Sequence, residues 1–596
     1  MQGRTQLAEL PNSTPSPPTN SGNFAARTEK PSPLRLTESK GRLATPLAPK
    51  VRHLPILSVA RRLEQQQTLT AVDAFSRSHE TDPVPDQAQY YRRLLPQALP
   101  NPGQQYAFEV DLDRCTGCKA CVTACHSLNG LDESEMWRSV GLIQSKTASP
   151  ARVQTVTSSC HHCVEPACLK GCPVGAYEKD PVTGIVKHLD DQCFGCQYCT
   201  LMCPYDAPKF NAELGIVRKC DMCSERLAVG EAPACVQACP NEAIRIQVVD
   251  KKTATELALA GNFIPGAPSP KATTPTTTYR SRISLPPDLD AVDGDLVRTE
   301  HTHLPLVFML TLTQLSVGTL LISALFGRSS STSQPAALLP VAVAFGFTGA
   351  ALVASVFHLG RPLLAWRAVL NLKTSWLSRE ALSFGVFAKL LLFYLVSLIP
   401  PEIVTFAYQS RFSSLQVPLG VLAGTTGVIG VFCSVMVYVA TGRGHWRASC
   451  TSIKFFGSLI VLGTSTVAML EILSPSAGVV HERTMALTLS LLLAFGIWKL
   501  LWEARRLRTG TSTDFAADRL MARIMLLRML ALVKTRFALG ILGILLLPSV
   551  QLFANIPAAA SQLCAVAGFI AALGGELMER VMFFRAAPGS RMPGGV

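Results

Sequence analysis

Residues 114–125 read RCTGCKACVTAC, and residues 193–204 read CFGCQYCTLMCP. Both stretches space four cysteines as C-x2-C-x2-C-x3-C, which is typical of thiolate ligands to iron–sulfur clusters. Three thiolates in one tight loop can bind three irons of a cubane, whereas the fourth cysteine lies past the loop and points to a neighbouring cluster. Ligand loops of this kind therefore come in pairs.

Two further groups of four cysteines complete the pattern. They keep the opening C-x2-C but lengthen the middle spacing, and they are Cys160, Cys163, Cys168 and Cys172, followed by Cys220, Cys223, Cys235 and Cys239. Four groups predict four clusters. Structural zinc would explain C-x2-C alone, but not a fourth cysteine at x3 followed by Pro204. A disulfide framework is typical of small secreted domains, whereas this chain has 596 residues.

The N-terminal residues have the composition of a region without a core. Residues 1–50 are rich in Pro, Ser and Thr, and we expect them to be disordered. Residues 51–103 are predicted to be a helical extension, because apolar side chains recur at near-helical spacing over 54–79. This helix would either pack on its own cluster domain or dock a partner subunit.

The next two regions differ in composition. Residues 104–250 are predicted to form an α+β domain of two ferredoxin-type modules that holds the four clusters. Residues 251–300 have the Pro- and Thr-rich composition of a linker. Within the cluster domain, alternating or β-branched runs predict short strands at 106–112, 184–188 and 243–249.

Apolar residues concentrate after residue 300, which explains the mean hydropathy of +0.27. Residues 301–585 are predicted to form an all-α, multi-pass membrane domain of eight helices. An even number of spans would return the tail, residues 586–596, to the side of the cluster domain. The segments close to the ~20 residues that cross a bilayer are roughly 304–326, 336–357, 381–399, 417–440, 452–473, 484–502, 537–555 and 557–575.

The net charge of +14 is expected in loops of a membrane protein, so nucleic acid is not an expected partner. With eight spans, eighteen Lys and Arg residues lie in loops and tail on the side of the cluster domain, against three on the other side. The positive-inside rule then predicts a cytoplasmic cluster domain in the bacterial inner membrane. The sequence contains no apolar run after a basic start, so no secretory signal is predicted, and this agrees with the orientation.

Two parts of the chain resemble known subunits. The run from RCTGCK at 114–119 to CVQACP at 235–240 resembles the iron–sulfur subunit of dimethyl sulfoxide reductase and related molybdoenzymes. The segment FHLGRP at 357–362, with SRE at 378–380, resembles the membrane anchor subunit of the same complex. In that family the two subunits are separate chains, and here they are fused. The resemblance implies that the anchor oxidises menaquinol and that the clusters pass electrons to a separate molybdopterin-containing catalytic subunit.

The resemblance also implies how the cysteines share four [4Fe-4S] clusters. The first group pairs with the fourth, and the second with the third. The implied ligand sets are Cys115, Cys118, Cys121 and Cys239 for cluster 1; Cys220, Cys223, Cys235 and Cys125 for cluster 2; Cys160, Cys163, Cys168 and Cys203 for cluster 3; and Cys193, Cys196, Cys199 and Cys172 for cluster 4.

A quinol site is expected near the start of the third span. Quinol oxidation releases protons with electrons, so the site needs a proton acceptor near a cluster, and histidine suits this role. The family's anchor has a His and a Glu, both tied to quinol, at places that match His358 and Glu380, and Arg361 lies between them. Without the resemblance, His358 would be an ordinary interfacial histidine.

Haem b is not expected, because a two-histidine haem needs histidines that face each other inside spans. The histidines of this half lie outside the predicted spans or at their ends; they are His301, His303, His358, His445 and His481. Lys389 lies inside the third span, where it could be functional or could extend to the membrane surface.

Two other functions fit parts of the pattern. A polysulfide-reductase-type anchor would reduce quinone or couple to ion transport, and carboxylates in mid-span would favour it. Glu471 and Glu576 are both expected near span ends, which argues against this function. An iron–sulfur sensor or scaffold would need neither eight spans nor four complete ligand groups.

Overall fold

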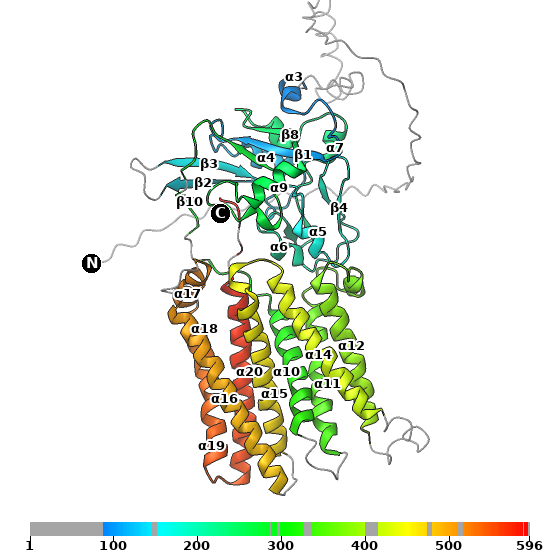
Figure 1. Ribbon diagram of the computed structural model, residues 1–596, viewed down its shortest axis with the longest axis vertical. Helices are drawn as coiled ribbons and strands as arrows, with labels where there is room; N and C mark the ends of the chain where they lie inside the picture. The colour runs from blue at the N-terminus through cyan, green and yellow to red at the C-terminus, as the bar shows by residue number, and fades with distance from the viewer. Residues whose placement is uncertain are drawn as a thin grey trace, which may run out of the picture. The chain divides into compact units, whose positions relative to one another are not determined.

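The computed structural model describes residues 88–145, 152–286, 288–294, 298–326, 335–399, 415–473, 479–509, 516–587, 589 and 591–593. The predicted disordered region and the predicted helix over 54–79 lie outside these residues. The described part of the protein opens with α3 (Ala88–Tyr91) and η1 (Arg92–Leu94). A cluster domain of short strands and helices follows, and then a bundle of long helices (Figure 1).

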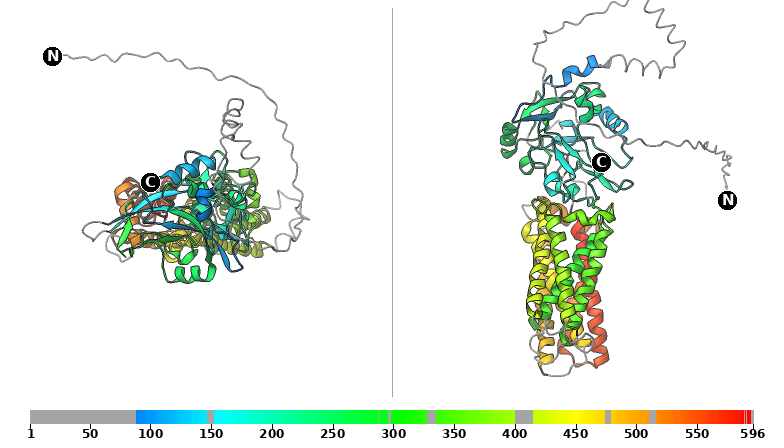
Figure 2. Two further views of the ribbon diagram at one scale, coloured as in Figure 1. Left: turned by 90° about the horizontal axis from the view of Figure 1, so that it is seen from above. Right: turned by 90° about the vertical axis from the view of Figure 1, so that its right-hand side faces the viewer.

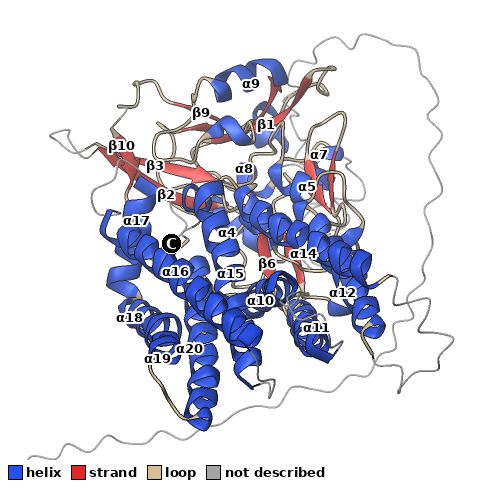
Figure 3. Ribbon diagram, turned by 60° about the horizontal axis from the view of Figure 1, so that its bottom comes forward, coloured by secondary structure: helices blue, strands red, loops and turns tan. Residues whose placement is uncertain are grey.

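Small sheets hold the cysteine loops of the cluster domain. The two strands that flank the domain, β1 (Gln104–Asp111) and β8 (Ile244–Asp250), pair antiparallel from Gln104–Asp250 to Val110–Ile244 (Figure 1), and the strands are drawn in red in Figure 3. The remaining antiparallel pairs are β2 (Ser139–Ser145) with β3 (Val153–Ser158), β4 (Tyr177–Lys179) with β5 (Val186–His188), and β6 (Lys209–Asn211) with β7 (Ile216–Arg218). The predicted strands at 106–112, 184–188 and 243–249 correspond to β1, β5 and β8.

Short helices follow the ligand loops. Each begins inside or directly after a cysteine group, so one end of every helix is tied to a ligand loop. They are α4 (Ala120–Leu128), α5 (Ala167–Gly171), α6 (Tyr198–Met202), α7 (Ser224–Ala228) and α8 (Ala234–Gln237).

The structure differs from the expected linker at 251–300. This stretch contains α9 (Lys251–Leu259), η2 (Pro270–Ala272) and two strands. β9 (Thr278–Arg280) pairs parallel with β1, and β10 (Leu289–Ala291) pairs antiparallel with β2. Thr273, Thr274 and Thr276 are buried, and the backbone carbonyls of the first two accept hydrogen bonds from residues 164 and 165. The threonines are therefore part of the cluster domain, although their composition is that of a solvated segment.

The prediction of eight spans is confirmed in number. The long helices lie side by side in Figure 1 and in the right-hand view of Figure 2. They are α10 (Leu304–Phe326), α11 (Pro335–Val356), α12 (Trp376–Ser397), α14 (Gln416–Val439), α15 (Ala448–Leu473), α16 (Val479–Thr509), a seventh span built from α18 (Leu530–Gly540), η6 (Ile541–Leu546) and α19 (Leu547–Phe553), and α20 (Ala558–Arg585).

The ends of several spans differ from the prediction. The third span begins at Trp376, five residues earlier than predicted, so Glu380 lies inside the helix and is buried. The eighth span extends to Arg585, which places Glu576 well inside it. A further helix, α17 (Ala516–Arg528), lies between the sixth and seventh spans.

A network of ion pairs is buried among α15, α16, α18 and α20. We call it the buried ion network, and its members are Lys454, Lys499, Glu503, Arg536, Glu576, Glu579 and Arg580. Arg536 lies 2.9 Å from Glu576 and 3.1 Å from Glu503, and Lys499 contacts Glu576. The backbones of Gly540 and Gly575 leave room for the Arg536 guanidinium.

The buried ion network corrects two expectations from the sequence. Glu576 is a buried carboxylate inside a span, although the sequence predicts it near a span end. Lys454, Arg536 and Arg580 belong to the predicted loop charges, but they lie within helices and are paired. Without these three, most of the eighteen Lys and Arg residues counted on the side of the cluster domain remain, and they still outnumber the three on the other side.

Lys499→Met should lower the free energy of unfolding by about 3–5 kcal/mol, because it removes one partner of a buried ion pair and leaves Glu576 incompletely compensated. Chemical unfolding of the full chain in detergent measures this change. Lys389→Met is the matched control, since Lys389 is exposed on α12 and its loss should cost about 0.5 kcal/mol or less. Equal destabilisation by both variants would contradict the conclusion that the buried ion network stabilises the bundle.

Candidate electron-transfer site

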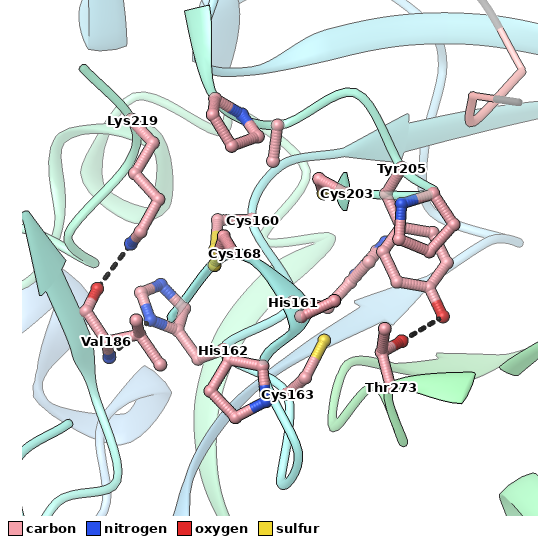
Figure 4. Close-up of a pocket in the computed structure, with 15 residues that line it drawn as sticks. Cys160, His161, His162, Cys163, Cys168, Val186, Cys203, Tyr205, Lys219 and Thr273 are labelled. Carbon is pink, nitrogen blue, oxygen red and sulfur yellow. Dashed lines mark hydrogen bonds between the residues drawn. The ribbon is translucent and has the colours of Figure 1, made fainter. Parts of the chain in front are cut away.

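The structure brings the sixteen thiols together in four sets. One cavity is lined by Cys115, Cys118, Cys121 and Cys239. A second cavity is lined by Cys160, Cys163, Cys168 and Cys203, four of the residues drawn in Figure 4. These are the two sets that the family resemblance implies for clusters 1 and 3, and we call them site 1 and site 3.

The other two sets consist of thiols that lie close enough to influence one another's ionisation. Site 2 comprises the thiols that surround Cys125, and site 4 those that surround Cys196. Cys125 and Cys220 lie close to each other and to Cys223, and Cys235 joins them. Cys196 and Cys199 are close to each other and to Cys172 and Cys193.

Local backbone geometry explains how three thiols of one loop point the same way. Gly117 and Lys119 in the first group have φ values of 74° and 61°, and Gly195 and Gln197 in the third group have 73° and 59°. Left-handed residues at alternate positions curl the backbone into a concave loop. The sequence supplies glycine at the first of these positions in both groups.

Two further observations indicate that these residues suit an iron–sulfur cluster. Backbone N–H groups donate to ligand sulfurs, from Ala176 to Cys172 at 3.2 Å and from Ala243 to Cys239 at 3.2 Å, and such hydrogen bonds are typical of cluster thiolates. Among the described residues, no three His, Cys, Asp or Glu side chains converge closely enough for one metal ion. The thiols surround cavities instead, which suits a cluster of several atoms better than zinc.

Burial makes several of the uncombined thiols poor acids. It raises the pKa of Cys203 to about 11 and that of Cys125 to about 12. Binding a cluster to these thiols must therefore displace protons, so the free energy of cluster binding depends on pH.

Two buried cations lie between the sites, and the sequence offered no signal for them. The ammonium group of Lys219 donates to the backbone carbonyls of Val186 and Cys220, and its charge lies near Cys160 and Cys168 of site 3 (Figure 4). The guanidinium of Arg138 lies near Cys121 of site 1 and Cys235 of site 2. Both cations oppose the negative charge that thiolate-bound clusters bring into a buried region.

Two histidines complete the wall of site 3. His161 and His162 lie inside the C-x2-C of the second group, so their position was visible in the sequence although no role was assigned. The Nδ1 atom of His161 is 2.8 Å from the Thr277 hydroxyl, and His162 Nδ1 accepts a hydrogen bond from the Val186 N–H at 3.1 Å. Burial lowers the pKa of His161 to about 3, so its ring is neutral.

The four sites form a connected series. Tyr177 lies near Cys199 and Cys172 of site 4 and near Cys168 of site 3. Cys220 of site 2 lies near Cys160 of site 3. Cys121 of site 1 lies near Cys125 and Cys235 of site 2. The order is therefore site 4, site 3, site 2 and site 1, and Cys118 of site 1 is exposed.

Site 4 lies against the loop that follows the second span. The N–H groups of Gly360 and Arg361 donate to the carbonyls of Gly195 and Phe194, at 3.3 Å and 3.0 Å. A Cβ atom on Gly360 would lie 2.1 Å from the Gly215 carbonyl oxygen, so only glycine allows this approach. On the other side of the contact, Asn371 donates to the carbonyl of Cys172 at 2.8 Å.

The predicted quinol-site residues meet this contact in different ways. The His358 imidazole lies within hydrogen-bonding reach of the Cys196 backbone, and burial lowers its pKa to about 4. Arg361 donates to the carbonyls of Asp190 and Cys193, so its guanidinium holds the two domains together.

Glu380 lies buried on α12, where its carboxylate accepts a hydrogen bond from the Ser434 hydroxyl. Burial and, after it, the Glu380 carboxylate raise the pKa of the Tyr198 phenol, so Glu380 is a neighbour of the site 4 loop. Tyr198 itself donates to the Val437 carbonyl of α14 at 2.8 Å. The structure therefore places both His358 and Glu380 beside the same cysteine loop.

The fold and the sites define a membrane-anchored iron–sulfur electron-transfer protein. Residues 106–127 match the family described as a 4Fe-4S binding domain, residues 151–249 the 4Fe-4S dicluster domain, and residues 298–585 the DMSO reductase anchor subunit (DmsC). This protein belongs to the family of dimethyl sulfoxide reductase-type iron–sulfur subunits, joined in one polypeptide to an anchor of the DmsC family.

Three relatives illustrate the iron–sulfur half. The B subunit of the anaerobic dimethyl sulfoxide reductase of Haemophilus influenzae is 38% identical over 157 residues, which cover 25% of this chain and 76% of that protein. The corresponding B subunit of Escherichia coli (strain K12) is 36% identical over 176 residues, 28% of this chain and 83% of that protein. The thiosulfate reductase electron transfer subunit PhsB of Salmonella typhi is 38% identical over 150 residues, 25% and 78%.

Gly360→Ala should loosen the contact between site 4 and the anchor, because the added methyl group clashes with backbone and overpacking costs about 1–3 kcal/mol. Amide hydrogen exchange at residues 194–196 and 360–361 should become about tenfold faster or more, since about 1.4 kcal/mol is a factor of ten. Gly346→Ala is the control, because its Cβ would meet no atom within 4 Å. Unchanged exchange in Gly360→Ala would show that the contact is not tight.

Proposed function

We propose that this chain oxidises menaquinol and passes the electrons through four [4Fe-4S] clusters to a separate molybdopterin-containing reductase subunit. Cluster 1 is bound at site 1, cluster 2 at site 2, cluster 3 at site 3 and cluster 4 at site 4, with the ligand sets given above. The observation that carries the proposal is the contact between the His358 loop and site 4.

The quinol binds where His358 and Glu380 flank the site 4 loop. A neutral imidazole can accept a hydrogen bond from a quinol hydroxyl, and the Glu380 carboxyl offers a second polar group near the same loop. Arg361 acts as a positioning residue, since its guanidinium binds the backbone of Asp190 and Cys193. A quinol held there lies beside the first cluster of the series, so electrons need no mobile carrier.

The catalytic partner follows from what the chain contains and from its relatives. The described residues are accounted for by the cluster domain and the eight spans, and the matched families are electron-transfer and anchor subunits. The relatives are named as subunits of dimethyl sulfoxide reductase and thiosulfate reductase. Cys118 of site 1 is exposed, which supports site 1 as the exit towards the molybdoenzyme partner.

His358→Ala should leave the EPR signals of the clusters intact but abolish their reduction by a menaquinol analogue. The reason is that the substitution removes a quinol contact without touching a ligand thiol. Rapid-mixing absorbance, with dithionite as a reductant that bypasses the quinol site, measures the two reactions separately. His445→Ala is a matched control, because His445 is another buried histidine of the bundle. Normal reduction by quinol in His358→Ala would remove His358 from the mechanism.

We place the cluster domain on the cytoplasmic side of the inner membrane, because the positive residues in loops concentrate on that side. Protease added to intact spheroplasts should leave residues 88–294 uncut, whereas it should cut them in inverted vesicles. A periplasmic protein of the same cells serves as the control for protease access. Cleavage from outside would reverse the orientation.

A second candidate function is an ion-coupled anchor, and the buried ion network favours it. Glu503, Glu576 and Glu579 are buried carboxylates inside the bundle, and such groups often mark ion pathways. A membrane potential formed by proteoliposomes during quinol oxidation would favour the ion-coupled function.

A further inference from the structure

Three histidines lie in a row beside the proposed quinol site. His301 and His303 precede the first span, and His358 follows the second. The ring centroids of His301 and His303 are 5.0 Å apart, and those of His303 and His358 are 5.1 Å apart. The N–H of His303 donates to Nδ1 of His301 at 3.3 Å, and a φ of 47° at His303 belongs to this tight turn.

The row runs from the interior to the surface. His358 and His303 are half-buried, and His301 is exposed. The ring of Phe584 on α20 covers His303 from the bundle side, with centroids 5.9 Å apart. The charged and titratable groups that face His303 are His301, His358 and Arg443, and Glu300 in turn lies near Arg443.

Quinol oxidation requires a route for protons that the clusters cannot supply. Each quinol loses two electrons and two protons, and iron–sulfur clusters accept only the electrons. His358 is half-buried beside the site 4 loop and Glu380 is buried on α12, so a quinol bound by these two side chains would lie away from bulk water. A chain of imidazoles is suited to this task, because each ring can take a proton on one nitrogen and release one from the other.

We infer that His303 and His301 form the proton exit of the quinol site. The inference rests on the proposed function. For each quinol, two O–H bonds break, two electrons pass in turn to the cluster at site 4, and quinone is left. The two protons pass from the quinol beside His358 to the imidazole of His303, then to His301, and from there to water on the side of the cluster domain.

The environment of His303 agrees with a transient carrier. Burial, and then the neighbouring His358, His301 and Arg443, lower the pKa of His303 to about 4. The ring is therefore neutral at pH 7 and can receive a proton, and the neighbouring His301 is exposed to water. Because protons and electrons leave on the same side, the route itself moves no charge across the membrane.

The test uses the full chain with its clusters, reconstituted in lipid at low buffer concentration. His303→Asn should slow cluster reduction by a menaquinol analogue about tenfold or more, because positioned proton transfer contributes about 10²–10⁴-fold. Reduction by dithionite should be unchanged, and added imidazole should restore part of the lost rate. Phe584→Leu is the control for lost packing against His303, and its rate should remain within about twofold of the wild type.

A second variant tests the exit where folding is not at risk. His301 is exposed, so His301→Asn should slow the reaction only at low buffer concentration, and a higher buffer concentration should restore the rate. A wild-type rate in His303→Asn would overturn the proton exit, and so would a slow rate that imidazole does not raise and that Phe584→Leu shares. A wild-type protein that quinol does not reduce at all would overturn the proposed function and the proton exit with it.

Discussion

The close approach of three glycines joins the two halves of this protein. Gly195 belongs to the site 4 loop, Gly215 to the turn between β6 and β7, and Gly360 to the loop after the second span. No side chain fits between them, so the backbones touch, and the Gly360 N–H donates to the Gly195 carbonyl. Under the proposed function, this contact decides how far a quinol beside His358 would lie from the cluster at site 4. The covalent fusion of the two halves keeps them at equal number, and this contact, together with those of Arg361, Asn371 and Tyr198, holds the site 4 loop against the anchor.

Charge compensation governs the cluster domain. A thiolate-ligated cluster is negative, and burying a negative charge is costly unless a cation or hydrogen-bond donors face it. Lys219 between sites 3 and 2, Arg138 between sites 2 and 1, and the backbone N–H groups that point at sulfur supply that compensation. They also favour the reduced form of each neighbouring cluster, since reduction adds a negative charge. The same groups that stabilise the folded domain therefore influence how readily electrons enter it.

The sequence predicted what is encoded locally and missed what depends on distant partners. The cysteine groups and the eight apolar segments are local patterns, and the structure contains both. The structure of residues 251–300 could not be predicted in this way, because β9 forms a strand only by pairing with β1, about 170 residues earlier in the sequence. Arg536 and Arg580 look like loop charges in the sequence because they contact other helices, Arg536 through Glu503 of α16 and Glu576 of α20, and Arg580 through Gln314 of α10 and Ser458 of α15. His301 and His303 carried no signal alone, since the fold must first bring the start of one span to the end of the next.

The buried ion network and the histidine row are linked through α20. Arg580 lies over the rings of Phe455 and Phe583, at 4.1 Å and 5.5 Å from their centroids. Phe583 packs on Tyr438 of α14, and the next residue, Phe584, covers His303. Ion pairs that hold α20 against α15, α16 and α18 thus fix the aromatic wall behind the proton exit. The packing of α20 therefore forms part of the surroundings of the histidine row, even though no quinol contact is assigned to this half of the bundle.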